Sequence, residues 1–109
     1  MDVVVFRLGA QQFGIPLAHV SQVFPVAEIA PLSGATVPVR GTIDLHGELT
    51  PVVDLGHRVA HAWTELRLEQ QFILVTGPTR RVVLLADEVE GVQSIADGAL
   101  VLATDLLDG

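Results

Sequence analysis

Residues 39–55 constrain the fold most, because they read as a strand, a tight turn and a return strand. Apolar Ile43 and Leu45 alternate with polar neighbours, which is the period-two pattern of a half-buried strand. Gly47 lies where a hairpin needs a positive φ, which glycine adopts at little cost. Pro51 in the return strand has no N–H to donate, so an edge or a bulge is expected there.

Short apolar runs between turn residues continue along the chain and predict about eight or nine strands with little helix. Residues 72–75 and 82–86 are continuous apolar runs around a Gly-Pro turn, so they are expected to be central strands covered on both faces. The other expected strands are 3–8, 13–16, 21–26, a short one within 29–38, one ending at residue 95 and one at 100–103.

One short helix is expected near residues 55–63, directly after the hairpin. Asp54 is placed to cap its N-terminus, and Leu55, Val59 and Ala62 fall near one face. Together with the strands, this pattern predicts an all-β fold class built from small antiparallel barrels.

The charge and composition of the chain narrow its classes of partner. At 109 residues it is long enough for one domain, or for two very small subdomains that share a core. It has 13 Asp and Glu against 6 Arg and no Lys, so neither nucleic acid nor an anionic membrane surface is expected as a partner. The absence of Cys excludes disulfides and thiolate catalysis. There is no basic leader and no apolar run near the ~20 residues of a membrane span, so a cytoplasmic location without direct membrane insertion is expected.

Two histidines on the expected helix form the clearest metal-like pattern. His57 and His61 are spaced i, i+4, so both rings could face one ion. The pattern lacks the Glu of an H-E-x-x-H motif and a third ligand, so two solvated helix histidines are the better interpretation. Asp54 could orient His57, but a helix cap explains it without any chemistry. No metal site and no cofactor are therefore expected.

No group of residues predicts catalysis. None of the serines lies in a G-x-S-x-G turn or beside a nearby His, which argues against nucleophilic chemistry. The three serines of the chain are Ser21, Ser33 and Ser94. A small metal-dependent enzyme stays only as an alternative. A general SH3-like peptide binder would need an aromatic groove, which one Trp (Trp63) and no Tyr do not supply.

Two charged segments are interpreted as solvated rather than functional. Asp87, Glu88 and Glu90 are expected to form a charged turn that keeps a sheet edge in solution, in preference to a cation site. Arg80 and Arg81 could bind an acidic partner, but their place beside the Gly-Pro turn favours a solvated hairpin end.

Four segments in order resemble the family of CheW-like coupling domains. Residues 8–23 resemble the family's F-x-L-G…Y/F-G-I…V…V lead. Residues 41–55, Gly-Thr-Ile-Asp-Leu-His-Gly-Glu-Leu-Thr-Pro-Val-Val-Asp-Leu, are similar to its G-V-x-N-L-R-G-x-x-x-P-V-x-D-L block. Residues 87–92 and the end of the chain at 100–107 are similar to segments of the family's second half. The resemblance runs nearly from end to end.

The resemblance implies a single CheW-like domain, 1–109, made of SH3-like antiparallel barrels. About 10–65 would form a complete first barrel, and 1–9 with 66–109 an incomplete second barrel. Only Gln93–Ala99 lie between the region of Val92 and the last strand, where the family has a long acidic loop and another strand. The chain in this respect resembles the shortened, FrzB-like form of the family.

The resemblance also implies a non-enzymatic adaptor of a bacterial chemosensory pathway, with no catalytic residues. Family members hold the cytoplasmic tip of a chemoreceptor against the regulatory domain of a histidine kinase. Truncation of the second barrel is expected to weaken or abolish the kinase contact, and full coupling of receptor to kinase is the alternative. Other CheW-like proteins, or a second copy through the exposed sheet edge, are further expected partners. Carried over by position, the receptor groove would contain Val20, Gln22, Val23, Gly41, His46 and Val92.

Two positions in the hairpin depart from the family pattern. Asp44 stands where the family has Asn, and His46 stands where it has Arg. The change to His46 replaces a permanent cation with a group that is charged only in mild acid. A partner contact that responds to pH is expected there, and the alternative is a turn residue that points only to water. Gly47, Pro51 and Asp54 are expected to keep the shape of the turn.

Overall fold

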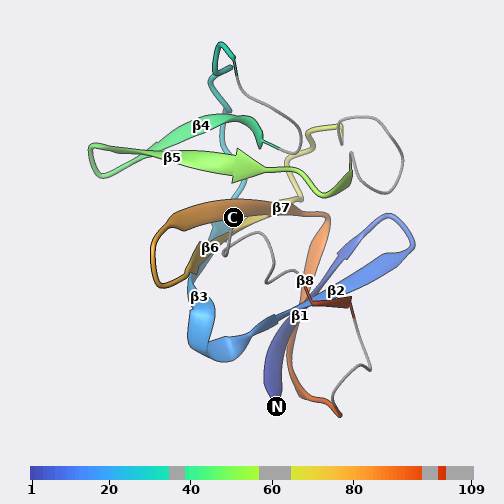
Figure 1. Ribbon diagram of the computed structural model, residues 1–109. Helices are drawn as coiled ribbons and strands as arrows, with labels where there is room; N and C mark the ends of the chain where they lie inside the picture. The colour runs from blue at the N-terminus through green and yellow to red at the C-terminus, as the bar shows by residue number, and fades with distance from the viewer. Residues whose placement is uncertain (35–38, 57–64, 97–100, 103–109) are drawn as a thin grey trace.

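The structure is a computed structural model that describes residues 1–34, 39–56, 65–96 and 101–102. Within these ranges the chain forms two sheets, one with the strand order β8-β1-β2-β9 and one with the order β3-β6-β7-β5-β4 (Figure 1). The elements are β1 (Asp2–Leu8), β2 (Gln11–Pro16), the 3-10 turn η1 (Leu17–His19), β3 (Val20–Pro25), β4 (Val39–Leu45), β5 (Glu48–Val53), β6 (Gln71–Thr76), β7 (Arg81–Ala86), β8 (Glu88–Ser94) and β9 (Val101–Leu102).

The all-β fold class is confirmed, but the pairing is not antiparallel throughout. Most neighbouring strands pair antiparallel, whereas β5 pairs with β7 and β2 pairs with β9 in parallel. The antiparallel pairing expected of the barrels is therefore found between most neighbouring strands, and these two short parallel pairings were not predicted. A hairpin makes its own two strands antiparallel, but β5 and β7 come from different hairpins, so the turn sequences do not fix their relative direction.

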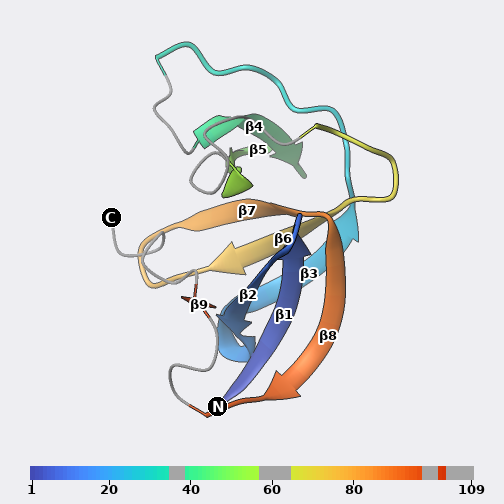
Figure 2. The same ribbon diagram turned by 90° about the vertical axis from the view of Figure 1, so that its right-hand side faces the viewer.

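The β6–β7 hairpin lies at the centre of the molecule and is buried on both faces, as the sequence predicted. Figure 2 shows it between the β4–β5 hairpin and the strands β1, β2 and β8. Its side chains alternate between two apolar clusters, because successive residues of a strand point to opposite faces. Core one contains Ile73, Val75, Val82, Leu84 and Ala86, with Phe6, Leu8, Phe13, Ile15, Val53 and Leu55. Core two contains Phe72, Leu74, Val83 and Leu85, with Ile43 and Val52.

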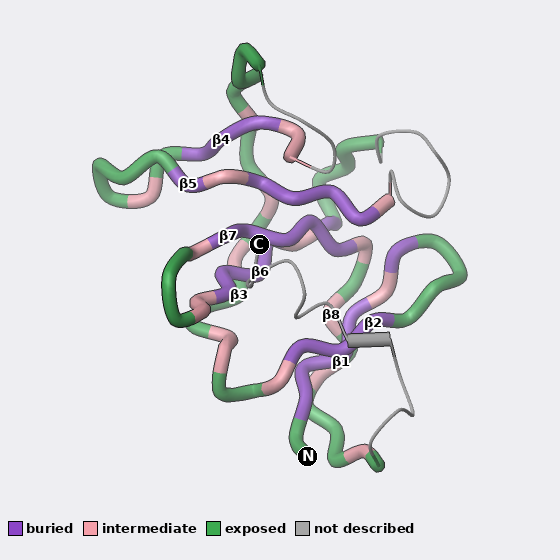
Figure 3. The backbone as a smooth tube through the Cα atoms, in the orientation of Figure 1, coloured by how far each residue is buried: buried purple, intermediate pink, exposed green. Residues whose placement is uncertain are grey.

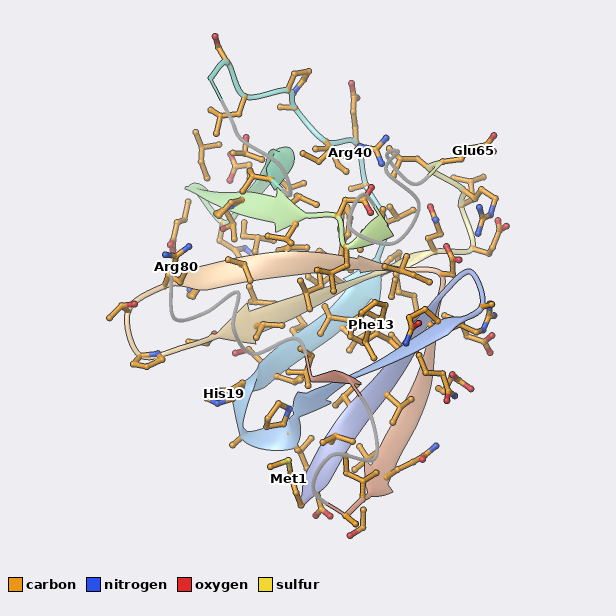
Figure 4. All side chains as sticks on the ribbon, turned by 45° about the vertical axis from the view of Figure 1, so that its right-hand side comes forward. Met1, Phe13, His19, Arg40, Glu65 and Arg80 are labelled. Carbon is orange, nitrogen blue, oxygen red and sulfur yellow. The ribbon has the colours of Figure 1, made fainter. Side chains whose placement is uncertain are left out.

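The four-stranded sheet covers core one. Its strand β1 is buried along residues 3–6, and buried residues run through β1, β6 and β7 while the turns are exposed (Figure 3). The Phe6 and Phe13 rings from β1 and β2 stack with centroids 5.4 Å apart. Figure 4 shows Phe13 lying between β2 and the five-stranded sheet. Aromatic stacking and aliphatic packing therefore join the two sheets.

The predicted hairpin at residues 39–55 is present as β4 and β5. Gly47 has the expected positive φ of 89°. Pro51 lies directly before Val52 and Val53, the two residues of β5 that pair with β7, so its missing N–H interrupts none of the β5–β7 pairs. The open edge expected at Pro51 is therefore limited to the part of β5 that does not pair with β7. The strand as a whole lies inside the sheet, between β7 and β4.

Two expectations about architecture are not decided by the described residues. The helix expected near 55–63 lies outside them, apart from its first residues. The division into a barrel at about 10–65 and an incomplete barrel from 1–9 and 66–109 stays a prediction. The sheet pairings cross that boundary, since β3 pairs with β6 and β5 pairs with β7.

Candidate functional site

The first part of the predicted groove lies on β3, one of the two edge strands of the five-stranded sheet. Gln22 is exposed and Val23 is 37% exposed, whereas Val20 is half-buried against core one. The pairing of β3 with β6 shifts register between Val20 and Gln22, so one extra residue re-aims the side chains that follow. The bulge therefore turns Val23 toward solvent at an edge.

Val92 of the predicted groove lies on a different sheet. It is 57% exposed on β8, opposite Val4 of β1. In the part of the chain that the structure describes, β8 pairs with β1 alone and no pairing joins β8 to β3. The structure leaves exposed apolar side chains at both places, but a single continuous groove through Val20, Val23 and Val92 stays a prediction.

Gly41 is buried rather than part of an exposed wall. A Cβ at this position would meet the carbonyl oxygen of Ala30 and would lie 2.7 Å from Cγ2 of Ile29. The pairing of β4 with β5 also shifts register between Val39 and Gly41. Gly41 therefore acts here as a packing residue, which allows residues 29 and 30 to cross the strand closely.

His46 lies with Gly47 in the two-residue turn between Leu45 and Glu48. Its φ is 54°, and Gly47 follows at 89°, so both turn residues are in the left-handed region, as in a type I′ turn. The Gly47 N–H donates to Oδ1 of Asp44 at 2.7 Å. His46 is exposed at the tip of the hairpin, which Figure 1 shows far from β1, β2 and β8. The turn geometry was predicted for Gly47 but missed for His46.

Asp54 is fully buried and does more than cap a turn. Its Oδ1 accepts the N–H of Gly56 at 2.9 Å, the bond expected of an N-cap carboxylate. Its Oδ2 accepts from a guanidinium nitrogen of Arg40 at 3.1 Å (Figure 4 labels Arg40). Arg40 lies at the start of β4 and Asp54 follows β5, so this ion pair closes the open end of the hairpin. The Arg40 contact could not be read from the sequence.

Asp87 forms a polar junction between the two sheets. It lies between β7 and β8, and its side chain is only 13% exposed. Its carboxylate accepts from the Gly9 N–H at 2.7 Å, from Nε2 of Gln70 at 2.9 Å and from Arg67 at 3.0 Å. These donors come from the β1–β2 turn and from the loop before β6, so one side chain ties three segments together. We call Gly9, Arg67, Gln70 and Asp87 the Asp87 junction.

Opposing effects act on the pKa of Asp87. Burial raises the pKa, because it disfavours the charged form. The Gly9 amide, the Gln70 side chain and the Arg67 guanidinium outweigh burial and hold the pKa of the carboxyl below its usual value. The carboxylate is therefore charged at neutral pH and stabilises the folded chain.

The acidic turn expected at residues 87–90 was wrong in its geometry. Glu88 and Glu90 lie on β8, which begins directly after Asp87. Glu88 forms an ion pair with Arg7 at 2.8 Å, and Glu90 accepts from Nε2 of Gln12 at 2.9 Å. The place of Asp87 directly after the apolar run of β7 is a sequence signal for its burial. Its hydrogen-bond donors could not be predicted, because they are distant in sequence.

Within the described residues the structure forms no metal centre. Across those ranges no three His, Asp or Glu side chains gather to hold a metal ion. His57 and His61 lie outside the described residues. Ser21 hydrogen-bonds the hydroxyl of Thr76 at 2.8 Å, and Nδ1 of His19 lies 3.1 Å from the Thr76 carbonyl oxygen.

Among the helices of the described part, none has the length and apolar character to cross a bilayer.

Comparisons with known proteins identify relatives across most of the chain. A family model described as CheW-like domain matches residues 2–105. The chain is 27% identical over 96 residues to the chemotaxis protein CheW of Rhizobium meliloti, covering 88% of this chain and 62% of that protein. It is 28% identical over 88 residues to the protein PilI of Pseudomonas aeruginosa, covering 81% of this chain and 49% of that protein.

A solved structure shares the fold. The crystal structure of the scaffolding protein TtCheW from Thermoanaerobacter tengcongensis matches with a TM-score of 0.76 at 24% identity, covering 90% of this chain and 64% of that one. The chain thus spans between 49% and 64% of the length of these three relatives.

Proposed function

The chain belongs to the CheW-like domain family, and on that premise we propose that it is a non-enzymatic scaffold in a bacterial chemosensory signalling pathway. The family match over residues 2–105 carries this proposal. The names of the relatives, a chemotaxis protein and a scaffolding protein, support it. The proposed place of action is the cytoplasm.

The proposed partner is the cytoplasmic tip of a chemoreceptor, which would lie against β3. The exposed Val23 and the half-buried Val20 offer an apolar surface, and Gln22 offers hydrogen bonds beside it. An amphipathic helix presents apolar residues at i, i+3 and i+4, which suits such a surface, while polar groups at its rim fix the register. Gly41 would contribute by shaping β4, since its own surface is buried. Val92 would add a contact from the other sheet.

The contact with the regulatory domain of a histidine kinase is proposed to be weakened. Within the described residues β8 is an edge strand, so the four-stranded sheet offers backbone groups there rather than a finished barrel wall. The same edge could pair with β8 of a second copy, giving a homodimer. Glu88 and Glu90 on β8 oppose association with another acidic chain, so the dimer is the weaker of the two proposals.

Binding assays with separate partners test the receptor proposal. Calorimetry with a receptor signalling-tip fragment should show binding, and Val23→Asp should weaken it by at least about tenfold, because a charge would be buried at the interface. Leu32→Asp is the matched control, since Leu32 is 48% exposed in the segment after β3 and outside the proposed surface. Equal losses in the two variants, or no binding by the wild type, would contradict receptor recognition by β3.

The kinase proposal is tested with the isolated regulatory domain of a chemosensory histidine kinase. Weak or absent binding is expected, and tight formation of a ternary complex with receptor and kinase would favour full coupling instead. Analytical ultracentrifugation of the wild type checks the edge dimer. A monomer at all concentrations would exclude it.

A further inference from the structure

Two apolar hollows lie side by side where the chain leaves β3 and crosses β4. The first, about 240 Å³, is lined by Val26, Ala27, Leu66, Leu68 and neighbouring charged residues. The second, about 300 Å³, is lined by Ala30, Thr42, Ile43, Asp44 and Leu49. Glu28 lines both, so they form one surface, which we call the Glu28 strip.

The apolar side chains of the Glu28 strip are unusually open to solvent. Leu68 is 94% exposed and Leu49 is 69% exposed. Exposed leucines scattered singly need no explanation, but here they border concave apolar surface on a short stretch of the fold. The strip is separate from the proposed receptor surface, because Val23 and Val92 line neither hollow.

The second hollow lies where a short strand pairing ends. Ala30 and Thr42 exchange both backbone hydrogen bonds, at 2.8 and 2.9 Å, as an isolated antiparallel bridge. Continuing that register by two residues would place Glu28 directly opposite Asp44. Like charges directly opposite each other destabilise an antiparallel pair, so the two carboxylates resist further pairing. The opening between them has Ala30, Ile43 and Leu49 along its walls.

The negative charges of the Glu28 strip are not neutralised by cationic side chains of the described residues. In the described part of the chain, Glu28 forms no hydrogen bond or ion pair. Arg67 lines the first hollow, but its guanidinium is held by Glu69 and Asp87. The chain has no Lys and a net charge of −7, so the positive group that would neutralise Glu28 and Asp44 is best supplied by another molecule.

We propose that the Glu28 strip docks a partner segment that carries an arginine or lysine flanked by apolar residues. The cationic head would lie between the carboxylates of Glu28 and Asp44, and its aliphatic stem would pack on Ile43 and Leu49. A flanking apolar side chain would enter the hollow beside Leu66 and Leu68. This recognition is independent of the proposed receptor contact. A second copy of this chain is a poor occupant, because its own acidic excess would face the strip.

The test titrates the full chain with a matched pair of short peptides, followed through amide chemical shifts. The probe is acetyl-Leu-Arg-Leu amide, and the control replaces arginine with citrulline, which has nearly the same shape without the charge. The arginine peptide should shift the amides of residues 28–30 and 42–49. It should bind about three times more tightly than the citrulline peptide at low salt, and the difference should shrink as salt is added.

Charge-matched variants complete the test. Glu28→Gln should remove most of the preference for arginine, whereas Asp2→Asn, the same change of charge at an exposed residue of β1, should keep it. Equal binding of the two peptides, equal effects of the two variants, or shifts centred on β3 or β8 would overturn the proposal. Self-association through the strip without added peptide would assign it to a second copy and would equally overturn it.

Discussion

At Gly41 the absence of a side chain decides how one segment crosses another. Residues 29 and 30 lie so close to β4 that a methyl group at position 41 has no room. We expect Gly41→Ala to lower the free energy of unfolding by about 1–3 kcal/mol, the usual cost of overpacking, since backbone must move. Urea unfolding measures this change. Faster hydrogen exchange at the amides of Ala30 and Thr42 should accompany it, and unchanged exchange there would contradict the packing role.

His46 has a strained backbone conformation for a residue that carries a side chain. A φ of 54° is uncommon outside glycine, and asparagine tolerates it better than most residues. His46→Asn should therefore stabilise the chain by about 0.5 kcal/mol, measured by urea unfolding. If the histidine was retained for a contact, the same variant should bind the partner less well. A destabilised variant would mean that the ring makes an intramolecular contact that outweighs the strain.

Asp87 should make stability depend on acid pH. Its pKa is lower in the folded chain than in the unfolded chain, so its contribution is present above about pH 4 and is lost as the pH falls through the folded pKa. Asp87→Asn should lower the free energy of unfolding by about 1–2 kcal/mol at pH 7 and by less in acid. Unfolding curves at pH 7 and pH 3 test this. An equal loss at both pH values would mean that charge does not matter there.

At the scale of single elements, the β6–β7 hairpin acts as a partition between two cores. Leu84 and Leu85 are neighbours in sequence, yet one packs in core one and the other in core two. Each is at most 1% exposed, so Leu84→Ala and Leu85→Ala should each cost about 2–5 kcal/mol. Thr79→Ala in the exposed turn is the control and should stay within about 0.5 kcal/mol. A small loss in either leucine variant would show that its core can collapse around the gap.

At the scale of the whole molecule, the shared hairpin should make the two sheets unfold together. Core one joins the four-stranded sheet to β6 and β7, and the Asp87 junction adds polar contacts between the same parts. We expect the urea midpoints followed at amides of β1 and of β4 to coincide, and Leu85→Ala to shift both by the same amount. Separate midpoints would show two independently unfolding units instead.

The sequence predicted those features that depend on local pattern. The apolar runs around the Gly-Pro turn identified β6 and β7, and Gly47 identified the tight turn of the β4–β5 hairpin. CheW-like family membership also followed from motifs that are continuous in sequence.

Features that depend on distant residues were missed. The parallel pairing of β5 with β7, the carboxylate of Asp87 under donors from residues 9, 67 and 70, and the Arg40–Asp54 ion pair all join separate segments. Gly41 belongs to the expected receptor groove only by its position in the family pattern, and a glycine in a strand fits a close contact with a partner as well as a close contact within the chain. Only the position of residues 29 and 30 distinguishes the two.

The central place of β6 and β7 has a consequence for how the chain is made. Both cores need side chains from residues 71–86, and β1 finds its neighbour β8 only at residues 88–94. A ribosome synthesises the chain from its N-terminus, so apolar β1, β2 and β3 emerge long before the strands that bury them. Neither core can close until the residues up to Ala86 have been synthesised, and until then the apolar side chains of β1 and β2 lack the partners that bury them.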